Sequence, residues 1–141
     1  MILAALAEKD PGNADWQRDL EISHNKVGDV LKDQGDLAAA LDEYRANLDI
    51  CQRLAEKDPN NAGWQRDLFV SYTRIGLVAN RKNDLLAALD AFKKAEKIAL
   101  HMNEISPTAA RSDGDLNWVQ ARLEETRRKI AGSASTAIRK K

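Results

Sequence analysis

The sequence predicts an all-α fold, namely an α-solenoid of antiparallel helical hairpins (a superhelix) closed by a C-terminal capping helix. Sliding residues 1–48 over residues 49–96 gives 23 identical positions without a gap. Self-similarity at a fixed period is the signature of a repeat protein. Within each copy, apolar residues recur at helical spacing. One repeat of 48 residues therefore corresponds to two helices.

Composition and charge exclude several classes of function. Lys+Arg and Asp+Glu are both 22, so no net charge attracts nucleic acid or an acidic membrane. Aromatic residues, at 5%, are too few for a base-stacking platform. The single cysteine cannot form an intramolecular disulfide. Neither a signal-peptide core nor a run of about 20 apolar residues is present, so the expected location is cytoplasmic.

The first ten residues resemble the end of a helix rather than its beginning. Residues 2–7 align with residues 50–55, which close a long helix in the next copy. We therefore interpret residues 1–10 as the end of a preceding second helix. Either an upstream part of the repeat has been removed, or this short helix caps the array.

The first repeat is predicted at residues 14–58. Proline in Asp10-Pro11-Gly12-Asn13 ends the preceding helix, and the asparagine is a good N-cap for the next one. The first helix covers about 14–34 and ends at Gly35-Asp36, a C′ glycine followed by a new N-cap. The second helix covers 37–57, with a clear apolar stripe along one side.

The second repeat is predicted at residues 62–106, with helices over about 62–82 and 85–105 and an Asn83-Asp84 turn between them. The third copy is incomplete, because Ser112 stands where the tryptophan belongs. A capping helix is predicted at 113–131, since a solenoid needs a polar outer helix at its end. Residues 132–141 are small, polar and basic, and we predict a disordered tail.

A packing motif recurs in both copies, at Val27-Gly28 with Ala40 and Tyr44, and at Ile75-Gly76 with Ala88 and Phe92. It pairs a bulky residue and glycine in the first helix with a small residue and an aromatic in the second. This motif resembles that of the tetratricopeptide repeat (TPR) family. The period of 48 exceeds the family's 34, as in the extended repeats of kinesin light chains and of some bacterial multi-repeat proteins.

The resemblance implies a peptide- or partner-binding groove on the concave face formed by the first helices. Its ten positions are Asn25, Lys26, Asp29, Lys32, Asp33, Thr73, Arg74, Leu77, Asn80 and Arg81. Four cations against two carboxylates favour a ligand with acidic groups. The competing interpretation is that these are solvated helix faces. Asp29 stands where the clamp of chaperone-binding TPR domains has asparagine, so chaperone binding is not predicted.

The doubled Trp-Gln-Arg-Asp-Leu sequence has two interpretations. Trp16 and Trp64 are either binding hot spots or structural wedges between one hairpin and the next, and we favour the wedge. In the structural interpretation, Arg18 and Arg66 pair with neighbouring acids such as Asp10 and Asp58.

No residues point to catalysis, to a cofactor or to a metal. His24 and His101 have no second ligand at metal spacing. Cys51 lies on an apolar stripe and is interpreted as a small buried hydrophobe. Phosphate loops and nucleophile motifs are absent from the sequence.

We therefore expect a non-catalytic protein–protein interaction module, a scaffold or adaptor that binds a peptide or partner protein. The alternative is a structural module that forms a homo-oligomer through an apolar edge at Ile2, Leu3 and Leu6. A weaker third hypothesis is nucleic-acid binding through the basic C-terminal end. Membrane association is not expected.

Overall fold

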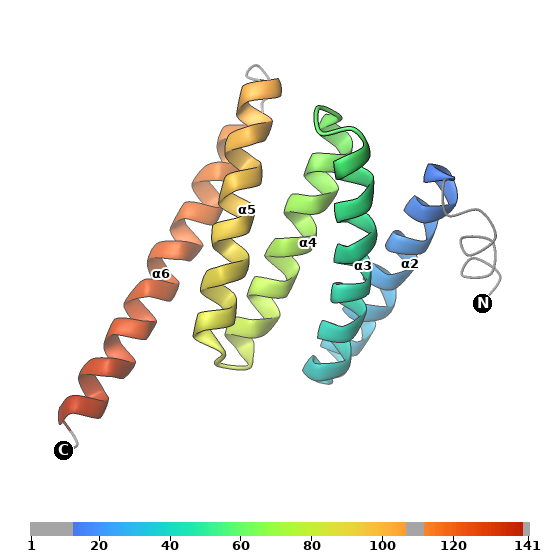
Figure 1. Cartoon of the computed structure of the whole chain (residues 1–141). Coiled ribbons are helices and arrows are strands. Elements are labelled where there is room, and N and C mark those ends of the chain that lie inside the picture. Colours follow the sequence, from blue (N-terminus) through green and yellow to red (C-terminus); the bar gives the residue numbers. More distant parts are fainter. Residues whose placement is uncertain (1–12, 107–111, 140–141) are drawn as a thin grey trace. The chain divides into compact units, whose positions relative to one another are not determined.

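The computed structural model describes residues 13–106 and 112–139, and this part of the chain is all-helical, without a strand (Figure 1). Its helices are α2 (Ala14–Asp33), α3 (Leu37–Lys57), α4 (Ala62–Arg81), α5 (Leu85–Ile105) and α6 (Ser112–Arg139). No helix in these ranges is both long and apolar enough to cross a membrane.

The chain divides into two compact units, residues 1–71 and 72–141, and the boundary falls inside α4. In the first unit, α2 and α3 pack as an antiparallel hairpin (Figure 1). In the second, α5 runs back along the C-terminal part of α4, and α6 packs against α5.

The ends of the helices follow from capping residues. Asn13 and Asn61 each accept the backbone N–H of a tryptophan through the side-chain oxygen, at 3.1 Å. Asp36 caps α3 in the same way, accepting from the backbone N–H of Ala39 at 3.1 Å, and Asp84 caps α5. The predicted helix bounds are confirmed to within one residue for α2 to α5.

The two hairpin turns need a left-handed residue. Gly35 has φ +84°, and its counterpart Asn83 has φ +60°. Glycine adopts this conformation freely, and asparagine is among the few other residues that tolerate it. This explains how Asn83-Asp84 replaces Gly35-Asp36.

The glycine of each repeat lies directly beneath an aromatic ring. A Cβ added at Gly28 would lie 2.6 Å from Cε1 of Tyr44, and one added at Gly76 would lie 2.6 Å from Cε1 of Phe92. Tyr44 and Phe92 are 1% and 0% exposed. The glycine and the aromatic ring of the motif therefore contact each other in both copies.

Helix α6 is longer than predicted. It continues through residues 132–139, where the sequence analysis predicted the beginning of a disordered tail. Alanine-rich sequence favours helix, and the single Gly132 costs only about 1 kcal/mol relative to alanine. Val119 and Leu123 of α6 are buried. The predicted helix end at 1–10, the edge at Ile2, Leu3 and Leu6, and residues 140–141 lie outside the described residues.

Candidate functional site

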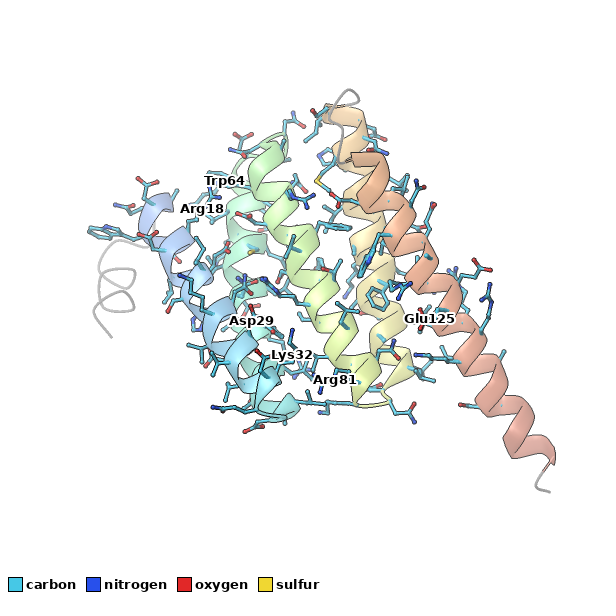
Figure 2. The ribbon with its side chains drawn as sticks, turned by 180° about the vertical axis from the view of Figure 1, so that it is seen from behind. Arg18, Asp29, Lys32, Trp64, Arg81 and Glu125 are labelled. Atoms are coloured by element: carbon cyan, nitrogen blue, oxygen red, sulfur yellow. The ribbon has the colours of Figure 1, made fainter. Side chains whose placement is uncertain are left out.

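The predicted groove positions of the first repeat all belong to α2, on which Figure 2 labels Asp29 and Lys32. Lys26 and Asp33 are exposed, whereas Asn25, Asp29 and Lys32 are half-buried. Asp29 already has a structural role, because its Oδ1 accepts a hydrogen bond from the Tyr44 hydroxyl at 2.5 Å. The two lysines and two aspartates of this set balance in charge.

The corresponding positions of the second repeat lie on the C-terminal part of α4. Thr73 is buried, Arg74 and Asn80 are half-buried, and Leu77 and Arg81 are exposed. This set has two cations and no carboxylate. The positive charge that the sequence suggested for the whole groove therefore belongs to the second unit.

Helix α6 adds side chains that the sequence analysis did not include in the site. Lys129 Nζ donates a hydrogen bond to Oδ1 of Asn80 at 3.1 Å, so α6 adjoins α4 at this point. Lys129 also pairs with Glu125 at 3.4 Å, and Arg122 pairs with Glu125 at 3.0 Å. Glu125 projects from the middle of α6 in Figure 2. A signal was present: Arg122 and Lys129 lie one period of 48 after Arg74 and Arg81.

An aromatic pair lies beneath these charges. The rings of Phe92 and Trp118 meet edge to face, with centroids 6.1 Å apart and an interplanar angle of 74°. The guanidinium of Arg122 lies 5.7 Å from the centroid of the Trp118 ring. Because Phe92 also covers Gly76, one ring links α4 to α6. Trp118, which has no counterpart in the other repeats, is 39% exposed.

A second polar cluster is buried in the first unit. The thiol of Cys51 lies 3.1 Å from Oε2 of Glu21, and Nδ2 of Asn47 donates to the backbone carbonyl of Glu21 at 2.8 Å. Glu21 is only 3% exposed, and Asn47 and Cys51 are fully enclosed. Cys51 is buried as predicted, but it also serves as a hydrogen-bond donor.

Burial raises the pKa of the Glu21 carboxyl, and the hydrogen bond from Cys51 opposes this effect. Burial likewise raises the pKa of Asp67, whereas the nearby positive charges of Arg18 and Arg66 lower it. The Arg18 guanidinium lies 3.8 Å from Oδ2 of Asp67, too far for a hydrogen bond. The nearby Asp67 carboxylate also raises the pKa of Glu21 by repulsion. Glu21, Asn47 and Cys51 therefore form a buried polar cluster, and Asp67 and Arg18 lie at its solvent-accessible edge.

The doubled Trp-Gln-Arg-Asp-Leu segment begins α2 and α4. Trp16 and Trp64 are both half-buried, and their role as wedges between one hairpin and the next stays a prediction. Gln65 is buried, and its Nε2 donates to the Pro59 carbonyl at 3.0 Å. Arg18 pairs with Asp67 of the second copy, whereas its predicted partner Asp10 lies outside the described residues. Figure 2 shows Arg18 and Trp64 in this unit.

The histidines each pair with a glutamate. Nδ1 of His24 lies 2.6 Å from Oε2 of Glu43, and Nδ1 of His101 lies 3.8 Å from Oε2 of Glu104. Within residues 13–106 and 112–139, no group of three or more His, Cys, Asp or Glu side chains could hold a metal ion.

Comparison of the chain with protein-family models, with curated proteins and with solved structures finds no match.

Proposed function

We propose that this chain is a TPR-like, non-catalytic interaction module that binds a peptide or partner protein through the polar faces of its first helices. The observation that carries the proposal is a row of α4 side chains in which a half-buried arginine and an exposed arginine flank an exposed leucine. Arg74 and Arg81 lie seven residues apart, two turns of one helix face, with Leu77 between them. Leu77 is 39% exposed.

The glycine–aromatic packing supports the TPR-like interpretation of each hairpin. It places Gly28 under Tyr44 and Gly76 under Phe92 in the same register. This packing occupies one side of each first helix, and Lys26 and Arg74 lie two residues before these glycines, on the opposite side of the helix. An α-solenoid arrangement of the hairpins is part of the proposal.

Photo-crosslinking tests this function directly. A photoreactive amino acid is placed at Leu77 on α4, and in a matched chain at Leu100, which is 46% exposed on α5. We expect defined protein crosslinks from position 77 and none of the same species from position 100. Identical products from both positions would contradict binding through this face.

Self-association is the second candidate, and one comparison between the repeats favours it. Val30 and Val78 occupy the same repeat position, yet Val30 is 54% exposed and Val78 is 1% exposed. Val27, one turn earlier on α2, is 40% exposed. An apolar face that is buried in one copy and open in the other fits docking of a further helix from a second molecule.

Light scattering of the full chain tests this candidate. If α2 forms the contact, the protein is a dimer or larger, and Val30→Glu converts it to a monomer. A monomer at high concentration in the unmodified chain would rule the candidate out.

A further inference from the structure

The side of α2 that faces away from α3 carries three residues at a spacing of seven, Trp16, Ser23 and Val30, which we define as the α2 stripe. Positions seven apart on a helix differ by only about 20° in direction, so these side chains share one face. Glu21 and Gly28, which contact side chains of α3, lie on the other side of the helix.

The same stripe is closed in the second copy and open in the first. Identical residue types stand at the corresponding positions of α4, namely Trp64, Ser71 and Val78. Ser71 and Val78 are each 1% exposed, whereas Ser23 is half-buried and Val30 is 54% exposed. Val27 adjoins the stripe and is 40% exposed. The α2 stripe is therefore built from residues that the same chain encloses elsewhere, which marks it as an interaction surface.

Two α2 helices can pair through this stripe in antiparallel orientation. When Ser23 lies level with Ser23 of a second copy, Trp16 of each copy lies level with Val30 of the other, because both are seven residues from Ser23. Trp16 is then also within one turn of Val27 of the other copy. The small serine at the centre allows the helices to approach closely. The drift of about 20° per seven residues suits a crossing angle of about 20°.

The charges beside the stripe fit this antiparallel arrangement. Asp19 and Lys26 are both exposed and lie on the same edge of the stripe. In the antiparallel pair, Asp19 of each copy lies within one position of Lys26 of the other, so two equivalent ion pairs form. In a parallel pair, two-fold symmetry would place these edges on opposite sides of the contact and would separate the charges. Charge complementarity therefore favours an antiparallel second copy as the occupant of the stripe.

We propose that the α2 stripe is the contact of a two-fold homodimer, in which a second copy of this chain packs its own α2 antiparallel to the first. Trp16 of each copy packs against Val27 and Val30 of the other, Ser23 meets its counterpart at the two-fold axis, and Asp19 pairs with Lys26. This inference rests on self-association, the second candidate function above, and specifies its symmetry and register.

Disulfide trapping of the full chain tests the symmetry, because only a position at the two-fold axis meets itself. Ser23→Cys should give a covalent dimer on mild oxidation. Asp42→Cys, at an exposed position of α3, is the matched control and should not. The natural Cys51 is buried and is common to all the chains compared. Equal amounts of covalent dimer from the two variants would overturn the register.

Sedimentation equilibrium of charge variants tests the ion pairs. Lys26→Asp should raise the Kd of the dimer roughly tenfold, because it replaces two attractions with two repulsions. Asp19→Lys should have the same effect, and the double variant, which exchanges the two charges, should restore the Kd. Arg45→Asp, an equal change of charge at an exposed position of α3, should leave the Kd unchanged. A double variant that dimerises no better than the single variants would overturn the pairing.

Three outcomes separate this proposal from self-association in general, with circular dichroism to check that each variant is folded. A dimer that Val30→Glu dissociates, but that neither charge reversal weakens, would keep α2 as the contact and overturn the antiparallel register. A dimer that both Val30→Glu and Lys26→Asp leave intact would overturn the α2 stripe while self-association stands. An unmodified chain that stays monomeric at high concentration would overturn both.

Discussion

The Tyr44 hydroxyl donates a hydrogen bond to Asp29, and one repeat later these two positions hold Phe92 and Leu77. The phenol and its acceptor therefore change together between the copies. A similar change occurs at His24 and Glu43, which form a pair in the first copy and correspond to Tyr72 and Ala91. The hydrogen-bonding side chains of α2 therefore have their partners on α3, and the corresponding positions of the second hairpin lack these partners. This difference favours packing of α2 against α3 over packing of α2 against the second helix of the other repeat.

Asp29→Leu should destabilise the protein by about 1–3 kcal/mol, because it removes the acceptor of a hydroxyl on a buried ring. Tyr44→Phe should cost less, about 1 kcal/mol. The double variant, which copies the second repeat, should recover much of the loss. Urea denaturation of the three variants gives the coupling energy, and strictly additive effects would show that the pair does not act as a unit.

Gly28→Ala should lower the free energy of unfolding despite the higher helix propensity of alanine. The new Cβ would lie 2.6 Å and 2.8 Å from two atoms of the enclosed Tyr44 ring. Overpacking costs about 1–3 kcal/mol, which exceeds the propensity gain of up to about 1 kcal/mol.

Gly132→Ala is the matched control for that change. Gly132 is an exposed residue of α6, and nothing lies within 4 Å of an added Cβ. This variant should be slightly stabilised, by up to about 1 kcal/mol. Thermal melts measure both variants. If the melting temperatures of Gly28→Ala and Gly132→Ala shifted in the same direction, the packing argument would be contradicted.

Stability should depend on the ionisation of Glu21. Burial raises the pKa of Glu21 above its ordinary value of 4.5, so the folded state binds this proton more tightly than the unfolded chain. As pH rises from 4.5 toward the folded pKa, the unfolded chain loses the proton first, and the free energy of unfolding falls. Protonation of Glu21 therefore stabilises the first unit.

Glu21→Gln, which cannot titrate, isolates this contribution. The stability of the unmodified protein relative to the variant should decrease as pH rises above 4.5. Urea denaturation over a pH series measures the difference. Parallel curves for the two proteins would show that Glu21 has the same pKa in both states.

Much of the fold could be predicted from the sequence because the helix boundaries are set by local residues. Prolines, asparagine and aspartate caps, and the Gly35 turn fixed the ends of α2 to α5. The C-terminal end of α6 was missed because Gly132 and its small neighbours resemble a tail, although they also tolerate helix. No capping residue marked the end there.

The site was only partly predictable. The groove positions on α4 have the expected polar and cationic character, but their pairing with α6 depends on contacts between residues 49 positions apart, such as Lys129 and Asn80. The hydrogen bond that Asp29 accepts from Tyr44 could not be predicted, because it joins residues 15 positions apart on two helices. The buried Glu21–Cys51 contact joins residues 30 apart and gave no local signal.

Partner capture by charge-reversed full-length chains tests the central claim most directly. Arg74→Glu with Arg81→Glu reverses the cations of α4, and Lys93→Glu with Lys97→Glu makes the same change in charge on α5 of the same unit. The partner should be lost from the first variant and retained by the second, with both variants folded. Equal capture by the two variants would contradict recognition through α4.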